Sequence, residues 1–141
     1  MLFFEVMKHR RKLEPIIQQT WKRIGKDIPY PQVAEDNAEQ KLIYFGMIAY
    51  AMVYESGLAA GMSTSAAHYL SRMQVGKYKL GKSTTRVVED IFTGHENDDE
   101  KIYADFFLTR LAQIIKIVKS GEGEVEPLML ELAQAFKTTK A

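Results

Sequence analysis

Residues 42–54 read LIYFGMIAYAMVY, thirteen apolar residues in succession that are followed by Glu55 and Ser56. A helix that is apolar on all sides has to be covered by other parts of the protein, because no face of it suits water. A bilayer span needs about 20 such residues, whereas a run of about 10 to 14 is more typical of a buried core helix. We therefore predict the central helix of a soluble bundle and no membrane span. Extension of the run to Met62 would add only Glu55 as a charge, so a membrane helix is the alternative.

This central helix should begin near Asp36, because acidic residues favour a helix N-terminus. It should reach Ser56, with Gly57 as the stop signal. Two hydroxyl residues then provide an N-cap, Ser63 or Thr64, for a following helix that runs to about Met73.

The residues before the central helix follow helical spacing with a proline in the middle. Proline removes a backbone donor from a helix interior but suits a first turn. We predict a helix over 2–12 and a second one from Pro15 to Ile24; a single helix kinked at Pro15 is an alternative, as is a strand at "LFFEVM". The apolar positions of this pattern are Phe3, Val6, Leu13, Ile17, Trp21 and Ile24.

Three more helices are predicted in the second half of the chain. Ser83 or Thr84 should cap a short helix that ends at Gly94. The strongest helical pattern spans Asp98–Ser120, with Asn97 and acids at its start, lysines near its end and Gly121 just beyond it. A last helix opens at Glu126, directly before a proline. The sequence thus predicts an all-α fold, a single-domain bundle over 1–141 with five to six helices around a hydrophobic central helix.

The amino-acid composition excludes several classes of function. The chain has 141 residues, 46% of them hydrophobic, and a net charge of +1, so no global field drives it toward DNA or an acidic membrane. It has no cysteine, which excludes disulfides, thiolate metal sites and a cysteine nucleophile. The N-terminal residues place apolar before basic side chains, the reverse of a secretory signal. These features favour a cytoplasmic protein.

The segment from Gly76 to Ser83 matches G-x-x-x-x-G-K-[ST], the phosphate-binding loop of nucleoside triphosphatases. That loop requires a strand before it and a helix after it. The preceding residues, SAAHYLSRMQV, favour a helix, and nothing else in the sequence indicates a parallel sheet. We therefore interpret the match as an inter-helix loop. A nucleotide binder that uses the backbone and side chains of Gly76, Gly81, Lys82 and Ser83 is the third functional hypothesis.

Other chemistry finds little support in the sequence. His9, His68 and His95 lie far apart, and none belongs to a metal-binding motif, so we expect no metal, no cofactor and no catalytic residue. His68 is expected to be a hydrogen-bonded histidine at the edge of the core. The helices predicted at 64–73 and 84–92 suggest a helix-turn-helix, but their connection is longer than the usual turn of about three to four residues.

Charge is unevenly spread along the chain. Residues 8–26 hold seven bases and one acid, residues 72–86 hold five bases and no acid, and residues 89–100 hold six acids. We therefore predict a small cytoplasmic protein-binding module, an adaptor, inhibitor or neutralising partner of another macromolecule. A nucleic-acid-associated regulator that uses both basic segments is the alternative. The predicted partner-binding residues are Arg10, Arg11, Lys12, Lys22, Arg23, Lys77, Lys79 and Lys82.

The central helix also raises the possibility of a homodimer. Gly46, Ala49 and Ala51 would let a second helix approach closely. The competing explanation is that the helices at Pro15–Ile24 and Asp98–Ser120 cover it within one chain. In the homodimer, large aromatic contact area between the two chains would come from Tyr44, Tyr50 and Tyr54.

Overall fold

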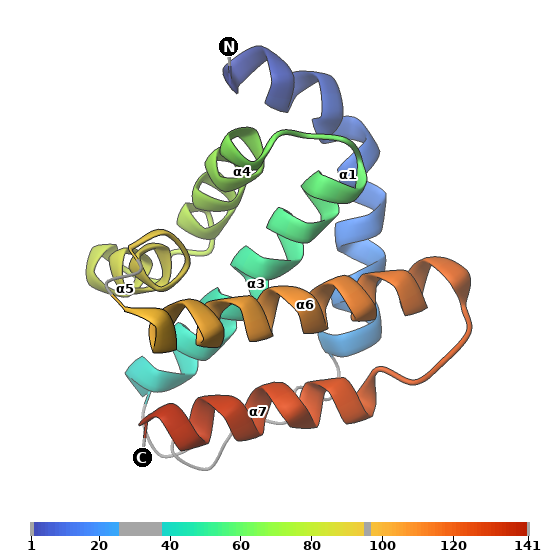
Figure 1. Ribbon diagram of the computed structural model, residues 1–141. Helices are drawn as coiled ribbons and strands as arrows, with labels where there is room; N and C mark the ends of the chain where they lie inside the picture. Colours follow the sequence, from blue (N-terminus) through green and yellow to red (C-terminus); the bar gives the residue numbers. More distant parts are fainter. Residues whose placement is uncertain (1, 26–37, 95–96, 141) are drawn as a thin grey trace.

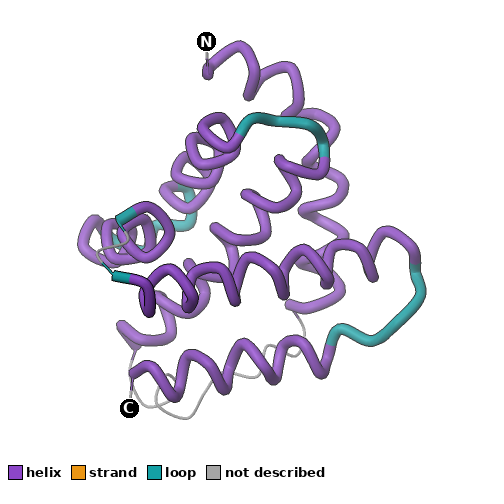
Figure 2. The backbone as a smooth tube through the Cα atoms, in the orientation of Figure 1, coloured by secondary structure: helices purple, strands orange, loops and turns teal. Residues whose placement is uncertain are grey.

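The computed structural model describes residues 2–25, 38–94 and 97–140. These ranges contain six helices and no strand, so the predicted all-α fold is confirmed (Figure 2). The helices are α1 (Leu2–Ile24), α3 (Ala38–Ala59), α4 (Thr64–Gly76), α5 (Lys82–Thr93), α6 (Asp98–Ser120) and α7 (Glu126–Lys140).

Helix α3 runs through the middle of the bundle, as predicted, with α1, α4, α5 and α6 packed against it (Figure 1). Within the apolar run, every residue from Ile43 to Val53 except Phe45 is buried. Tyr44 also reaches α7, because its ring lies 5.1 Å from that of Phe136. By length and composition α3 is the one described helix that could cross a membrane, but 72% of its most apolar window is buried inside the protein.

The small residues of α3 are covered by helices of the same chain. Ala49 and Ala51 have no exposed surface. A Cβ atom added to Gly46 would lie 2.8 Å from Val88 Cγ2 and 3.0 Å from Leu80 Cδ1, so α5 and the connection that precedes it already occupy this face. The expectation that these residues accept a second copy is therefore wrong, and coverage within one chain accounts for the apolar helix.

Gly57 does not end α3, contrary to prediction, because the helix continues to Ala59. The glycine is needed for packing instead: an added Cβ would lie 3.2 Å from Met62 Sδ and 3.3 Å from Ala67 Cβ. The chain turns at Gly61, whose φ of +93° suits glycine. The predicted start of the helix at Asp36 lies outside the described residues.

Helix α1 is continuous through Pro15, so the prediction of two helices is wrong, and so is the strand alternative for its first turns. Pro15 cannot donate to the carbonyl of Arg11, four residues earlier. Both residues are exposed, so water can hydrogen-bond this carbonyl and the cost of the proline is reduced. The single-helix alternative is the correct one.

Helix ends with local sequence signals are mostly as predicted. The side chain of Ser63 accepts a hydrogen bond from the Ala66 N–H at the start of α4, and that of Asn97 accepts one from the Glu100 N–H at the start of α6. Gly121, in the left-handed conformation with a φ of +73°, ends α6. Helix α7 starts at Glu126, as predicted.

The connection between α4 and α5 differs from the prediction. Helix α4 extends beyond Met73 to Gly76, and α5 begins at Lys82 with Gly81 as its N-cap residue and no side-chain cap. Ser83 and Thr84 therefore lie inside α5 and do not cap it. The connection is residues 77–81, shorter than expected, because the polar and glycine residues at its edges continue the helices.

Candidate partner-binding surface

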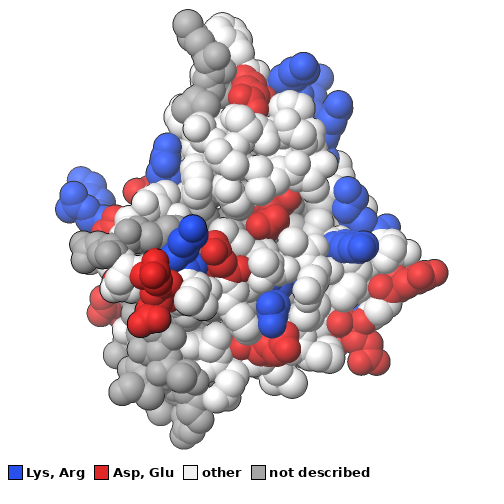
Figure 3. All heavy atoms as spheres, viewed as in Figure 1, with Lys and Arg blue, Asp and Glu red and all other residues white. Residues whose placement is uncertain are grey.

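Helix α1 carries several of the basic residues that are predicted to bind a partner, and these residues differ in their exposure. Arg11, Lys12 and Lys22 are exposed. Arg10 is half-buried and lines a small hollow between α1 and α4 together with Glu14. In Figure 3, blue side chains lie at the upper right edge of the molecule, where Figure 1 places α1, whereas red ones gather over the start of α6 and the α6–α7 connection. The outward side of α1 is therefore electropositive.

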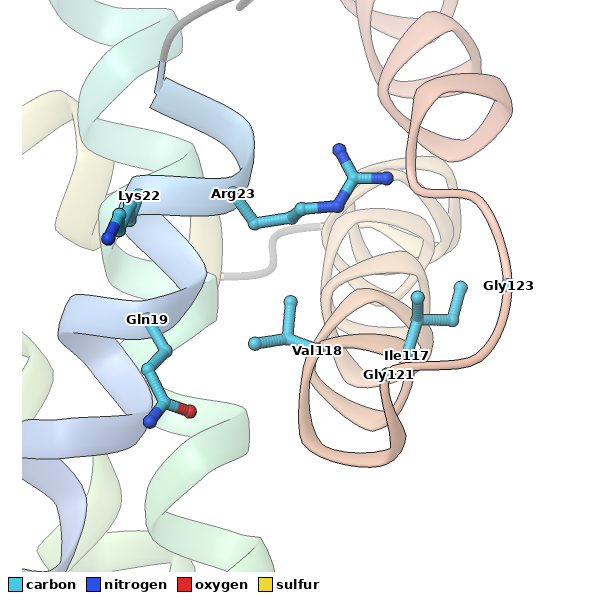
Figure 4. A pocket seen from close by; sticks show the side chains of 7 residues that line it. All are labelled: Gln19, Lys22, Arg23, Ile117, Val118, Gly121 and Gly123. Carbon is cyan, nitrogen blue, oxygen red and sulfur yellow. The ribbon is translucent and has the colours of Figure 1, made fainter.

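Arg23 is engaged within the protein. Its guanidinium donates to both carboxylate oxygens of Glu126, at 2.7 and 3.4 Å, which joins the end of α1 to the start of α7. The same hydrogen bond lowers the pKa of Glu126 and raises that of Arg23. Figure 4 shows Lys22 and Arg23 leaving α1 on different sides, so only Lys22 is directed away from this ion pair.

The hollow in Figure 4 lies between the end of α1 and the end of α6 and has a volume of about 600 Å³. Ile117 and Val118 form its apolar part, and Gln19 and Lys22 its polar part. Since Arg23 is paired with Glu126, the hollow does not bring several cations together for a ligand.

The two basic segments meet at three aromatic side chains. Trp21 Nε1 donates a hydrogen bond of 3.2 Å to the Tyr78 hydroxyl, which links α1 to the α4–α5 connection. Phe45 of α3 stacks on Trp21 with ring centroids 5.1 Å apart and contacts Tyr78 edge to face at 5.3 Å. All three rings are half-buried. Lysines adjoin them in sequence, and we call the set the aromatic–lysine cluster: Trp21, Phe45 and Tyr78 with Lys22, Lys77 and Lys79.

Sequence reasoning identified the three lysines of this cluster but missed its aromatic residues. Helical spacing assigns Trp21 to the core stripe of its helix, and it assigns Phe45 and Tyr78 to no site. A signal was present, since Tyr78 lies between two lysines and Trp21 directly precedes one. Such interleaving of basic and aromatic residues is typical of surfaces that bind single-stranded nucleic acid. The spatial contact itself joins residues 57 positions apart and could not be read from the sequence.

The glycine–lysine segment forms a helix–loop–helix and not the strand–loop–helix that a phosphate-binding loop requires. Gly76 is the last residue of α4, and Lys82 and Ser83 are the first residues of α5. A hollow of about 590 Å³ lies here, and its charged lining residues are three bases, Lys79, Lys82 and Arg86, and one acid, Glu89. The short connection is closer to that of a helix-turn-helix than predicted, but α5 carries Glu89 and Asp90, which phosphate would repel.

Among the described residues, no group of three or more histidine or acidic side chains could hold a metal ion. His68 shares a hydrogen bond of 2.6 Å with the buried hydroxyl of Tyr50, so the prediction of a hydrogen-bonded histidine at the core edge is confirmed. Burial raises the pKa of Tyr50, which keeps its hydroxyl protonated and unsuited to act as a base. His95 lies outside the described residues, and His9 is half-buried on α1.

Comparisons of the chain with protein-family models, with curated proteins and with solved structures found no match.

Proposed function

We propose that the chain is a non-catalytic, cytoplasmic protein-binding module that contacts an acidic surface of its partner through the aromatic–lysine cluster. The observation that carries this proposal is the contact between Trp21 and Tyr78, which brings the two basic segments together around half-buried aromatic rings. An adaptor, an inhibitor and a neutralising partner would all use such a surface.

The physical argument rests on how binding energy is distributed in interfaces. Tryptophan and tyrosine are enriched among the residues that contribute most to binding, because they bury a large area with few rotatable bonds. The rings of the cluster hold one another in place, since Phe45 contacts both Trp21 and Tyr78. Little conformational entropy would then be lost on binding. The exposed lysines would steer an acidic partner toward the rings.

Co-purification with matched charge variants tests this function. The first variant carries Lys22→Glu and Lys77→Glu at the aromatic–lysine cluster. The control carries Lys116→Glu and Lys119→Glu on α6, where both lysines are also exposed, so the net charge changes equally. A protein retained by the wild type and the control but lost with the first variant is the expected result. Equal retention by both variants, or loss with both, would contradict the proposal.

A nucleic-acid-associated regulator is the second candidate, favoured by the same rings. Bases stack on exposed aromatic side chains while lysines contact phosphates, and this mode tolerates any sequence. The discriminating measurement is binding to duplex and single-stranded DNA as a function of salt. If the three lysines of the cluster each neutralised one phosphate, log affinity would fall with log salt with a slope of about −2 to −3. The protein-binding proposal predicts no saturable binding at physiological salt.

A further inference from the structure

The first two turns of α1 carry three large apolar side chains that other helices do not cover. Phe3 is 57% exposed, Phe4 68% and Met7 51%, whereas Val6 between them is buried in the core. Helical spacing predicted that Phe3 belongs to the buried stripe, and this is wrong. Figure 1 shows that these turns of α1 extend beyond the neighbouring helices. We call Phe3, Phe4 and Met7 the apolar tip.

The apolar tip is held in a fixed orientation by an acidic residue of the same turn. Glu5 accepts hydrogen bonds from the backbone N–H of Ser63, at 2.6 Å, and from its hydroxyl, at 3.1 Å. These bonds lower the pKa of Glu5 and tie α1 to the start of α4. Glu5 is the only acid among residues 2–13. Its carboxylate is therefore directed to α4, and no other acid of the first three turns opposes an anionic surface.

Basic residues follow the apolar tip along the outward side of the helix. Lys8, Arg11 and Lys12 are exposed, and we call them the basic collar. With a rise of about 1.5 Å per residue, Lys8 lies about 6 Å and Arg11 about 10 Å behind Phe4 along the helix axis. Helices at a membrane interface bury their apolar side about 5–10 Å deep, at the boundary between head groups and acyl chains. A tip that enters the interface end-on to the same depth therefore places the collar at the level of the head groups.

We propose that the apolar tip and the basic collar dock on an anionic lipid surface. Charge complementarity favours this occupant, because the collar carries three bases and Glu5 is engaged with Ser63. The length of the apolar patch argues against a helix-binding groove of a protein. Such grooves accept apolar anchors over two or more turns, at i, i+3, i+4 and i+7. Here the pattern stops after Met7, and the next outward positions are basic.

This surface is separate from the aromatic–lysine cluster. Phe3 and Trp21 are 18 residues apart in one helix, a distance of about 27 Å along the axis. Docking of the tip would therefore leave the cluster accessible to a protein partner, and either proposal can fail without the other.

Fluorescence of a label at the tip tests the docking directly. The chain has no cysteine, so Phe4→Cys provides a unique attachment site for an environment-sensitive dye in the full-length protein. Leu130→Cys on α7 is the matched control, since Leu130 is 60% exposed and distant in sequence. The titrants are vesicles of phosphatidylcholine alone and vesicles that contain phosphatidylserine. We expect a blue shift for the Phe4 label with the anionic vesicles only, and no shift for the Leu130 label.

Vesicle co-sedimentation measures the contribution of each part. Phe4→Asp should reduce binding strongly, and Leu130→Asp should not. Removal of Lys8 and Arg11 by serine substitution should reduce the partition coefficient about fivefold for each base, which corresponds to about 1 kcal/mol per base near an anionic surface. The charge-matched control is Lys116→Ser with Lys119→Ser on α6.

Four outcomes would overturn the docking proposal. The first is no binding to anionic vesicles, and the second is equal binding to neutral vesicles. The third is a blue shift of the Phe4 label that grows with the concentration of the labelled protein without lipid. The fourth is a blue shift of this label that appears when another protein is added and not when vesicles are added. The third outcome would assign the tip to a second copy of the chain, and the fourth to a protein groove.

Discussion

Replacement of Gly46 by alanine tests whether α5 packs on α3 as closely as the structure shows. The added Cβ would lie 2.8 Å from Val88 Cγ2 and 3.0 Å from Leu80 Cδ1, closer than side-chain atoms normally approach. Forcing extra volume into a packed core costs about 1–3 kcal/mol. Alanine would return about 1 kcal/mol through its better helix propensity. We therefore expect Gly46→Ala to lower the free energy of unfolding by up to about 2 kcal/mol.

Three further variants make the measurement specific. Gly76→Ala is the matched control, because Gly76 also lies in a helix but an added Cβ would meet nothing within 4 Å. It should leave stability unchanged or raise it by up to about 1 kcal/mol. Combining Gly46→Ala with Val88→Ala should relieve the clash, so the two substitutions should show a favourable coupling of about 1 kcal/mol or more. Urea unfolding followed by circular dichroism is measured for the wild type, Gly46→Ala, Gly76→Ala, Val88→Ala and the double variant. If Gly46→Ala stabilised the protein as Gly76→Ala does, with no coupling to Val88, the packing of α5 on α3 would be refuted.

The remaining predictions concern the glycine–lysine loop and two carboxylates. Lys82→Ala should leave stability nearly unchanged, and calorimetry with ATP or GTP and magnesium should detect no binding; saturable binding lost in this variant would show that the loop is a nucleotide site. The hydrogen bond from Arg23 lowers the pKa of Glu126. The ion pair therefore stabilises the fold at pH values above the ordinary pKa of glutamate, and this stabilisation is lost as the pH falls through the lowered pKa. Glu126→Gln should therefore flatten the acid side of the stability profile, and an unchanged profile would count against the ion pair. Burial raises the pKa of Glu55, so its carboxylate opposes folding above that pKa. Thermal unfolding of Glu55→Gln should show a higher midpoint than the wild type at neutral pH and the same midpoint in acid; a lower midpoint at neutral pH would contradict this sign.

Local signals in the sequence were sufficient for the helices and for several of their ends. The apolar run at 42–54 predicted the central helix because its composition leaves it no side that suits water. Ser63, Asn97 and Gly121 predicted helix ends because each acts on the backbone within three or four residues of itself. These interactions depend only on neighbours in the chain.

Features that depend on tertiary packing could not be predicted in this way. Gly57 resembles a helix stop in sequence, but its role is to admit Met62 and Ala67. Pro15 resembles a break between helices, yet it is exposed and the helix continues. Phe3 has the spacing of a core residue but lies beyond the helices that would cover it.

The candidate site could likewise be predicted only where its features are local in the sequence. Composition and charge identified the two basic segments, because the excess of lysine and arginine is a local property. The contact between Trp21 and Tyr78 that brings them together depends on how α1 crosses the α4–α5 connection. That geometry is set by the packing of both elements on α3 and has no counterpart in either segment alone.

Photo-crosslinking in living cells tests most directly whether the aromatic–lysine cluster binds a protein. A benzophenone amino acid replaces Lys77 in one variant and Lys116 in the control, both exposed positions. The protein-binding function predicts one discrete protein adduct from position 77, lost when Lys22→Glu is added, and no such adduct from position 116. Adducts that nuclease removes, the same adducts from both positions, or none from position 77 would contradict it.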